Sequence, residues 1–223
     1  MANADSMRLG GPFRPLILAG GGGHALVIAE AAAAAGFEPV GYLDDDPDAV
    51  LGRLPNKVLH VGKIGELDRI ADRGWIMAIG GLAFRGRLIE RLAQLELGRG
   101  AKTVIHPSAI ISPTCSIGAG VFIGPGAIVN ARAVIMDHAI VNTGAIVEHE
   151  CIIGHNSHIA PGAVLAGRVR VGAQTLVGVG ARVLPELSIG DRCVVGAGSM
   201  VVRSVVDEKM VVGVPARERD FGA

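Results

Sequence analysis

Apolar and polar positions follow two different periods along this chain. Up to about residue 100, short apolar runs alternate with stretches of helical character. After that, every sixth residue from Ile105 to Val201 is Ile, Val or Leu, without an insertion. The residue four positions after each of these is usually small, as at Ala109, Cys115 and Ala127. A six-residue period predicts a parallel β-helix, whose aliphatic residues fill the interior and whose small residues let the chain turn a corner.

The first part of the chain predicts alternating strands and helices. Apolar runs at 16–20, 38–43 and 75–79 indicate buried strands, and residues 24–35 and 84–97 indicate helices. This alternation is typical of a small open, Rossmann-like α/β domain with a mostly parallel sheet. The expected organisation is therefore a disordered extension (1–13), an α/β domain (14–100), a β-helix (101–206) and a C-terminal cap segment (207–223).

Composition excludes several classes of protein. Lys+Arg and Asp+Glu are 21 each and aromatic residues are 3%, so we expect no nucleic-acid partner. Half of the chain is hydrophobic, which is too apolar for a disordered protein. The apolar stretch from Leu16 to Ala35 contains His24, Glu30 and a run of glycines, which argues against a membrane span. Because no signal-peptide pattern precedes it, we expect a soluble, cytoplasmic protein.

The three cysteines are expected to be structural. Cys115, Cys151 and Cys193 show neither zinc-type spacing nor the pattern of a disulfide framework. Each of them occupies the small interior position of a hexapeptide. We therefore predict that they pack inside the coil and take no part in chemistry.

One histidine of the repeat region is a candidate general base. Three six-residue sides make one coil, so residues 18 apart stack on one another. His149 is then expected between Ala131 and Gly167, whose minimal side chains leave an open place for a slender ligand. An imidazole titrates near working pH and suits proton transfer. A surface histidine at a corner is the alternative interpretation.

The same spacing gives neighbours to the residues around His149. Glu150 should stack between Arg132 and Arg168, which fits either an acidic partner of His149 or a rung of a surface charge ladder. Asn142 fits two roles, because its side chain could orient His149 or bond to the backbone of its own turn.

Six segments resemble a known family. They are the hexapeptides at 117–122 and 195–200, the glycine-rich turn at 20–25, the Leu-Asp-Asp at 43–45, the Asn-Thr-Gly-Ala-Ile-Val-Glu-His-Glu-Cys at 142–151 and the Gly-Val-Pro-Ala at 213–216. Together they resemble hexapeptide-repeat sugar acetyltransferases related to bacillosamine and perosamine N-acetyltransferases and to sialic acid O-acetyltransferases. The resemblance spans most of the chain and implies a left-handed β-helix, acetyl-CoA as cosubstrate, a nucleotide-linked amino sugar as acceptor and a homotrimer.

The resemblance also implies roles for individual residues. His149 would be the catalytic base and Glu150 its acidic partner. Contacts to acetyl-CoA would come from five positions of the coil: Asn142, His158, Gly167, Val179 and Ala197. Among these, His158 could polarise the thioester carbonyl. For His158, a satisfied structural histidine on the outer face, stacked between Ile140 and Leu176, is the alternative. The segment 213–216 would help to close the cofactor groove.

The glycine-rich turn has its own interpretation. Gly20 to Ala25 fits G-x-G-x-x-A between a strand and a helix, where glycines allow close approach and a helix N-terminus attracts a pyrophosphate. A complete NAD-binding fold needs a longer domain. The resemblance implies that the turn and its neighbours hold the nucleotide-sugar through six residues: Gly22, Gly23, His24, Asp44, Asp45 and Gly80. A solvated turn before Pro47 is the alternative for part of the Asp44–Asp46 run.

Three other functions fit parts of the pattern. Transfer to a sugar hydroxyl, as in sialic acid O-acetylation, would use the same fold. A metal-dependent hydratase of the γ-carbonic anhydrase type would need three converging histidines, and the repeats contain His138, His149, His155 and His158. A non-catalytic scaffold would need the stacking alone. We expect no metal.

Overall fold

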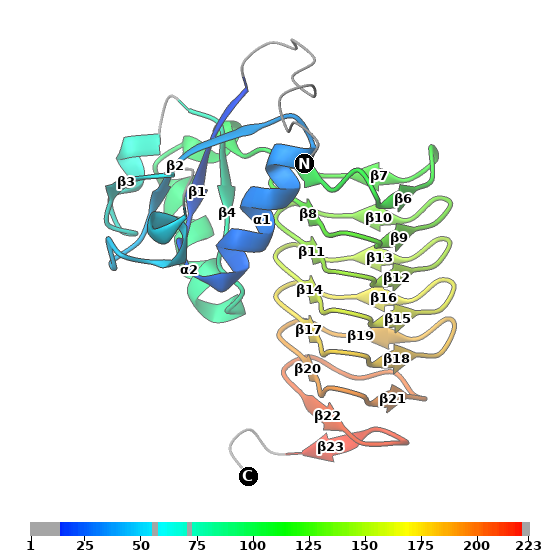
Figure 1. Ribbon diagram of the computed structural model, residues 1–223. Coiled ribbons are helices and arrows are strands. Elements are labelled where there is room, and N and C mark those ends of the chain that lie inside the picture. Colours follow the sequence, from blue (N-terminus) through cyan, green and yellow to red (C-terminus); the bar gives the residue numbers. More distant parts are fainter. Residues whose placement is uncertain (1–13, 55–57, 71–72, 220–223) are drawn as a thin grey trace.

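The computed structural model describes residues 14–54, 58–70 and 73–219, so the expectation for residues 1–13 lies outside the described residues. Figure 1 shows two parts side by side: an α/β front domain, blue to cyan-green, and a column of stacked coils, green to red. None of the described helices is long and apolar enough to cross a membrane.

The front domain is built on a four-stranded parallel sheet. The strand order is β3 (Leu59–Gly62), β2 (Glu38–Leu43), β1 (Pro15–Ala19), β4 (Trp75–Met77), and the helices are α1 (Gly23–Ala34) and α2 (Leu82–Gln94). Three 3₁₀ turns complete it: η1 (Val50–Arg53), η2 (Leu67–Ile70) and η3 (Leu97–Gly100). The predicted strands and helices are found within a few residues of their expected ends. Strand β3 was not predicted, because its short Leu-His-Val-Gly sequence is half exposed and carries no clear apolar run.

The strand order reverses between β1 and β4. From β1 the chain moves outward to β2 and β3, then returns to the other side of β1 to form β4. The carboxyl ends of two neighbouring strands therefore lead into α1 and α2 in diverging directions. In open α/β sheets, such a switch point is where ligands bind.

The coils form a three-sided column. Face 1 contains β5 (Val104–Ile105), β8 (Phe122–Ile123), β11 (Ile140–Val141), β14 (His158–Ile159), β17 (Leu176–Val177) and β20 (Val194–Val195). Face 2 contains β6 (Ile110–Ile111), β9 (Ile128–Val129), β12 (Ile146–Val147), β15 (Val164–Leu165), β18 (Arg182–Val183) and β21 (Met200–Val201). Face 3 contains β7 (Ser116–Ile117), β10 (Val134–Ile135), β13 (Ile152–Ile153), β16 (Arg170–Val171) and β19 (Ser188–Ile189). β22 (Met210–Val212) adds to face 1 and pairs antiparallel with β23 (Arg217–Arg219) at the end of the column.

The aliphatic and small residues of each hexapeptide occupy different places in these coils. Aliphatic residues such as Val129, Val147 and Leu165 are fully buried inside the column, and small ones such as Ala145 and Cys151 are buried at its corners. Cys151 and Cys193 are buried and Cys115 is half-buried, all three as free thiols. The placement predicted for the cysteines therefore agrees with the structure.

From Gly120 to Gly198, each corner contains one residue in the left-handed backbone conformation, and the corners differ in which residue this is. Between faces 1 and 2 it is glycine, as at Gly144 and Gly162. Between faces 2 and 3 it is charged, as at Glu150 with φ 60°. A residue with a side chain in this conformation costs about 1 to 2 kcal/mol, so each non-glycine residue there lowers the stability of the coil.

The front domain docks on face 1 of the column. Helix α1 lies between the front sheet and the coils (Figure 1), and its buried side chains share one apolar core with Val104, Phe122 and Ile140 of face 1. This core joins the two parts and orients the carboxyl ends of β1 and β4 relative to the coils.

Candidate active site

His149 lies on the corner between faces 2 and 3, directly after β12. Its side chain is 51% exposed and its imidazole covers Gly167 of the next coil. A Cβ atom at Gly167 would stand 2.5 Å from His149 Nε2, so the ring has this position because residue 167 lacks a side chain. The stacking of His149 on Gly167 that the 18-residue spacing predicts is therefore present on the coil.

Glu150 contacts His149 and both stacked arginines. Its carboxylate lies 3.4 Å from His149 Nδ1, 3.4 Å from Arg132 Nη1 and 3.0 Å from Arg168 Nε. The hydrogen bonds from Arg168 and then from His149 lower the pKa of Glu150. Because a carboxylate accepts, Nδ1 of His149 carries its proton here, and Nε2 is left with the lone pair that a general base requires.

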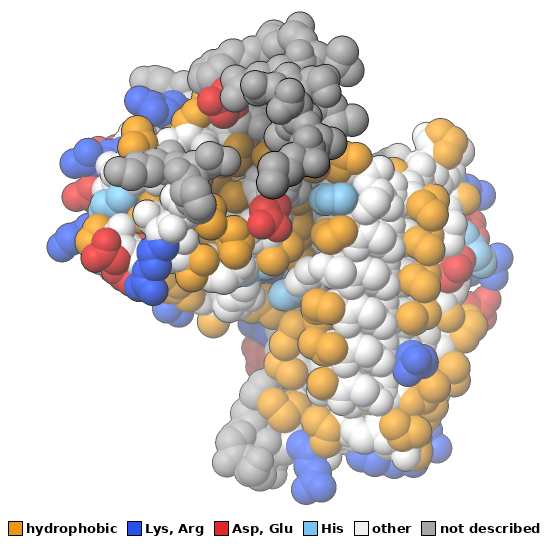
Figure 2. All heavy atoms as spheres, in the orientation of Figure 1, with side chains coloured by type: hydrophobic (Ala, Val, Ile, Leu, Met, Phe, Trp, Pro, Cys, Tyr) orange, Lys and Arg blue, Asp and Glu red, His pale blue; other side chains and the backbone are white. Residues whose placement is uncertain are grey.

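The same contacts extend into a ladder of alternating charge. Arg168 also bonds to Glu186 (2.8 Å), so Arg132, Glu150, Arg168 and Glu186 follow one another along this corner. Figure 2 shows basic, acidic and histidine side chains gathered on the coil edge that points away from the front domain. The two interpretations of Glu150 are thus compatible, since one carboxylate serves both the ladder and His149.

His158 lies on face 1, where the front domain covers it. It pairs in register with Ile140 and Leu176, as its spacing predicts. Its Nε2 is 3.0 Å from Asn142 Nδ2, and its ring centroid is 6.2 Å from that of His24. Burial, and after it the charge of Arg85, lowers the pKa of His158 to about 3, while a backbone hydrogen bond with Gly80 opposes this shift. His158 is a neutral imidazole held between the two parts of the protein.

Asn142 does not orient His149 in this structure. Its Oδ1 accepts from the Thr143 N–H of its own turn (2.8 Å), and its Nδ2 faces His158. Asn142 lies on the corner between faces 1 and 2, whereas His149 lies on the next corner along the chain. Within one chain, the backbone-bonding alternative is therefore the one observed.

The predicted front-domain residues gather at the switch point of the sheet. Gly22 and Gly81 are the N-caps of α1 and α2, and neither helix start is capped by a side chain. A Cβ at Gly22 or Gly23 would have no atom within 4 Å, so this backbone borders open space. Free N–H groups at two neighbouring helix starts favour an anion such as a diphosphate.

His24 and Gly80 stand beside this backbone. A Cβ at Gly80 would lie 3.9 Å from the His24 ring, and His24 Nε2 is buried without a hydrogen-bond partner among the described residues. Burial, and after it the charge of Arg85, lowers the pKa of His24 to about 4. His24 is therefore also a neutral imidazole at physiological pH.

The aspartates that follow β2 have separate roles. Asp44 Oδ2 accepts from the Gly21 N–H (2.8 Å) and so fixes the glycine-rich turn. Asp45 accepts from the Ile64 N–H (3.3 Å), and Asp46 accepts from the Asp48 N–H (2.9 Å) in a local turn. The turn interpretation explains Asp46, while Asp44 links β2 to the candidate anion site.

The predicted site residues divide into two groups within one chain. Face 1 carries the front domain, and in a three-sided column it lies opposite the corner that carries His149. Gly167 is on the His149 corner, whereas Val179 and Ala197 are on the corner between faces 1 and 2, as Asn142 is. One chain therefore does not bring His149 together with the front-domain residues.

The histidines of the hydratase alternative do not converge either. His138 and His155 meet at the corner between faces 3 and 1, with ring centroids 5.5 Å apart, and His149 and His158 lie elsewhere. Among the described residues, no group of three potential metal ligands is close enough to hold an ion. The described part of the chain thus provides no histidine triad for a metal.

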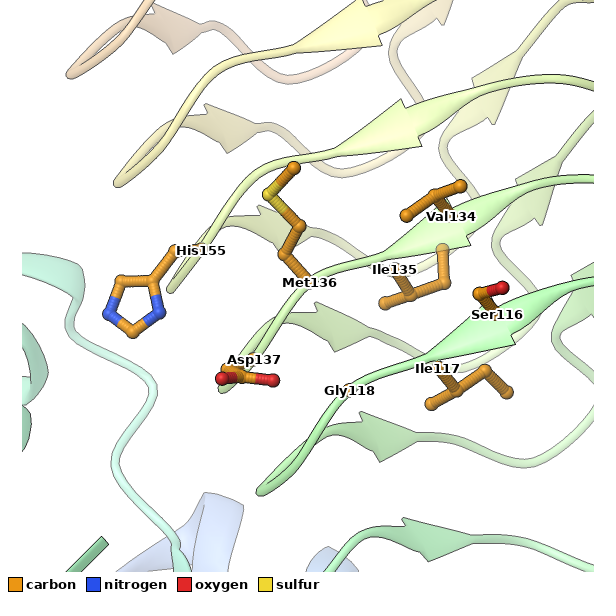
Figure 3. A pocket seen from close by; sticks show the side chains of 8 residues that line it. All are labelled: Ser116, Ile117, Gly118, Val134, Ile135, Met136, Asp137 and His155. Carbon is orange, nitrogen blue, oxygen red and sulfur yellow. The ribbon is translucent and has the colours of Figure 1, made fainter.

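Two surface hollows lie away from His149 and from the predicted residues of the front domain. One, of about 400 Å³, lies on face 3, where Asp137 and His155 point to one side of apolar side chains that include Met136 (Figure 3). Asp137 is already engaged there, because it accepts from the Ala119 N–H (2.8 Å). The other, of about 500 Å³, is lined by Ala93, Glu96, Gly98 and Arg99.

Sequence reasoning missed the residues that join the two parts. Arg85 of α2 is fully buried and bonds to Asn156 of the coil, 71 positions away. In the sequence, Arg85 looks like one of several arginines on the polar side of an amphipathic helix. The 18-residue stacking rule describes neighbours within the column and contains no information on what packs against it.

Comparison with known proteins agrees with this architecture. Residues 15–92 match the model of the PglD N-terminal domain, and residues 132–167 match that of the bacterial transferase hexapeptide with six repeats. No curated protein matches the chain. The front domain and the coils thus define a two-part hexapeptide-repeat transferase, with the left-handed β-helix expected from the sequence.

Solved structures narrow the class. A histidine-to-asparagine variant of perosamine N-acetyltransferase from Caulobacter crescentus, in complex with CoA and GDP-perosamine, is 37% identical, with 95% of this chain and 99% of that chain covered and a TM-score of 0.84. The acetyltransferase domain of PglB from Neisseria gonorrhoeae, in complex with acetyl coenzyme A, is 33% identical, with 93% and 100% covered and a TM-score of 0.84. The chain belongs to this family of sugar N-acetyltransferases. The expected family and the expected cosubstrate, acetyl-CoA, agree with these complexes.

Proposed function

We propose that the protein transfers the acetyl group of acetyl-CoA to the amino group of a nucleotide-linked amino sugar, with His149 as general base. The observation that carries the proposal is an exposed imidazole whose Nδ1 faces the Glu150 carboxylate (3.4 Å) and whose Nε2 lies over Gly167. Relatives with 33–37% identity that hold GDP-perosamine or acetyl-CoA support the substrate classes.

The chemistry follows from the two ring nitrogens. A sugar amine is nucleophilic once it has lost its proton, and His149 Nε2 accepts a proton as the amine attacks the thioester carbonyl. The C–N bond forms, the C–S bond breaks, and the imidazolium returns its proton to the departing CoA thiolate. Glu150 fixes the Nδ1–H tautomer and stabilises the transient positive charge, and Arg132 and Arg168 keep Glu150 ionised.

The acceptor would bind at the front domain. The open backbone at Gly22 and Gly23 and the two uncapped helix starts suit the diphosphate of a nucleotide-sugar. His24, Gly80, Asp44 and Asp45 border the same place. His158 hydrogen-bonds to the Gly80 backbone and Asn142 faces His158, so these two proposed contacts of acetyl-CoA adjoin the acceptor residues.

Acetyl-CoA would bind along the coils, against Gly167 on one corner and Val179 and Ala197 on another. Because these corners and the front domain lie on different sides of one column, the complete site requires two copies of the chain. We infer a homotrimer in which the His149 corner of one copy faces the front domain of the next.

Thiol release tests the reaction. Purified protein should release CoA thiol from acetyl-CoA with a GDP- or UDP-linked 4-amino sugar, and His149→Ala should abolish release while the trimer persists. His155→Ala is the matched control, because His155 holds the equivalent position on another corner. Full activity of His149→Ala would refute its role. The acetylated product should resist mild base, as an amide does, and a base-labile product would indicate an ester.

Mixed trimers test the shared site. His149→Ala lacks the base, and Gly22→Asp would place a carboxylate where we expect the diphosphate. Co-expression of the two inactive variants should restore about a quarter of the activity, because a quarter of the interfaces pair an intact front domain with an intact His149. No recovery in verified mixed trimers would refute a site between copies.

A further inference from the structure

The first turns of α2 dock on the corner between faces 3 and 1. Arg85 is 0% exposed, and its guanidinium bonds in two directions. Toward the coil, Nε donates to Asn156 Oδ1 (2.6 Å) and Nη2 donates to the Asn156 carbonyl (3.0 Å). Toward the front domain, Nη1 donates to the Ile79 carbonyl (3.2 Å). A single side chain thus links the two parts.

The bond to Ile79 lies next to the candidate acceptor site. Ile79 immediately precedes Gly80 and Gly81, whose backbone leads into the uncapped start of α2. On the coil side, His158 hydrogen-bonds to the Gly80 backbone in this loop, and Asn142 Nδ2 lies 3.0 Å from His158 Nε2. The position of residues 79–81 relative to face 1 therefore determines the shape of the place where both parts would contact the sugar.

Burying the charged side chain of Arg85 between two surfaces is energetically unfavourable. It forms no salt bridge with a described residue, and burial lowers its pKa to about 10. A buried charge without a carboxylate is usually less favourable than an apolar side chain of similar volume. The planar guanidinium offers instead a rigid geometry, because its donors are fixed relative to one another.

The coil side of this contact is also specific. Asn156 is 0% exposed and has a left-handed backbone (φ 54°). A Cβ at Gly86, next to Arg85, would stand 3.1 Å from Asn156 Nδ2, so α2 approaches the corner closely at this point. Gln174 occupies the equivalent place one coil further, with the same φ, and its side chain makes no hydrogen bond to any described residue.

We propose that Arg85 is a positioning residue that holds the loop 79–81 in register with face 1, so that the acceptor site is preformed across the two parts. The proposal rests on the proposed function. Acetyl-CoA would contact coil residues alone, so Arg85 should affect the binding of one substrate and leave the other unchanged. A residue that merely stabilises the fold would change the amount of active enzyme and neither KM.

Two variants remove the contact from opposite sides. Arg85→Lys keeps the charge but lacks the planar fork. Asn156→Gly removes the side-chain acceptor Oδ1, keeps the backbone carbonyl, and suits the left-handed backbone. The matched controls are Arg87→Lys, an exposed arginine on the same helix, and Gln174→Gly. We expect the KM for the nucleotide-amino sugar to rise about tenfold in both test variants, the effect of losing one charged hydrogen bond, with the KM for acetyl-CoA within about twofold. In both control variants, the two KM values should stay within about twofold of the wild-type values.

The outcomes separate the two proposals. If the wild type acetylates the sugar and neither test variant changes its KM, or if both KM values change together, the role of Arg85 is refuted and the proposed function stands. If the wild type neither binds nor acetylates a nucleotide-amino sugar by calorimetry and thiol release, both are refuted. Should Arg85→Lys fail to fold, Asn156→Gly decides the question, because its backbone is relieved of strain.

Discussion

Acidification should weaken the contact between the front domain and the coils. Three largely buried imidazoles lie along it: His24, His138 and His158. Burial is the main cause that lowers their pKa values from 6.5 to about 4, about 4 and about 3. The charge of Arg85 adds to the effect at each, and at His138 the neighbouring His155 lowers the pKa further while Asp137 opposes the shift.

The sign and size follow from linkage. Each folded pKa lies below the unfolded value, so the unfolded chain binds protons first as the pH falls. The stability of the native state is complete above about pH 7 and is lost from pH 6.5 down toward pH 4. At pH 5 each histidine lowers the free energy of unfolding by about 2 kcal/mol, so the three together lower it by about 6 kcal/mol. Near pH 5 the free energy of unfolding therefore changes by about 4 kcal/mol per pH unit.

Urea unfolding between pH 5 and pH 7.5, at one fixed protomer concentration, measures this slope. His138→Asn is the most useful variant, because asparagine tolerates the left-handed backbone at this position (φ 59°) and does not titrate. In this variant, the change in the free energy of unfolding per pH unit near pH 5 should be about one third smaller, because one of the three titrating histidines is gone. If the wild type is equally stable at pH 5 and pH 7, or if His138→Asn has the wild-type slope, the reasoning is refuted.

Three further predictions concern the candidate site and the thiols. Glu150→Gly should lower kcat at least about tenfold with an equal or higher Tm, because it removes the partner of His149 from a left-handed position that favours glycine; a kcat near that of the wild type would contradict the pairing. Gly167→Ala should displace the His149 ring and lower kcat by a similar factor while gel filtration and Tm stay unchanged, and unchanged kinetics would show that the ring needs no bare neighbour. Cys151, whose pKa burial raises to about 11, should react with a disulfide reagent at pH 8 after unfolding and not before, and rapid labelling of the native protein at this residue would refute its burial.

The repeating part of the molecule was predictable because its rule is local. An aliphatic residue every six positions determines which side chains point inward, and a coil of three such units determines what stacks on what. The pairs Arg132–Glu150 and Glu150–Arg168 could be predicted from spacing alone, and both are ion pairs in the structure. The register of His158 with Ile140 and Leu176 was predictable for the same reason.

The lateral contacts were not predictable, because they depend on how two differently built parts dock. Asn142 finds its partner in His158 and its own turn, although spacing allowed an interaction with His149. Arg85 and Asn156 are separated by 71 positions, and neither has a sequence context that indicates burial. His158 was expected on an outer coil face, and the front domain covers that face.

The use of glycine at the corners argues that the charged corner has a purpose. Between faces 1 and 2, the left-handed position is glycine in five consecutive coils, from Gly126 to Gly198, and a Cβ at any of them would meet no atom within 4 Å. Between faces 2 and 3 the same conformation is given to Arg132, Glu150 and Arg168, at about 1 to 2 kcal/mol each. Surface ion pairs contribute about 0 to 1 kcal/mol, so the ladder does not offset this cost through stability alone. Under the proposed function, the bare corner would hold the slender thioester, the charged corner would carry the proton transfer, and two copies of the chain would bring the two corners together.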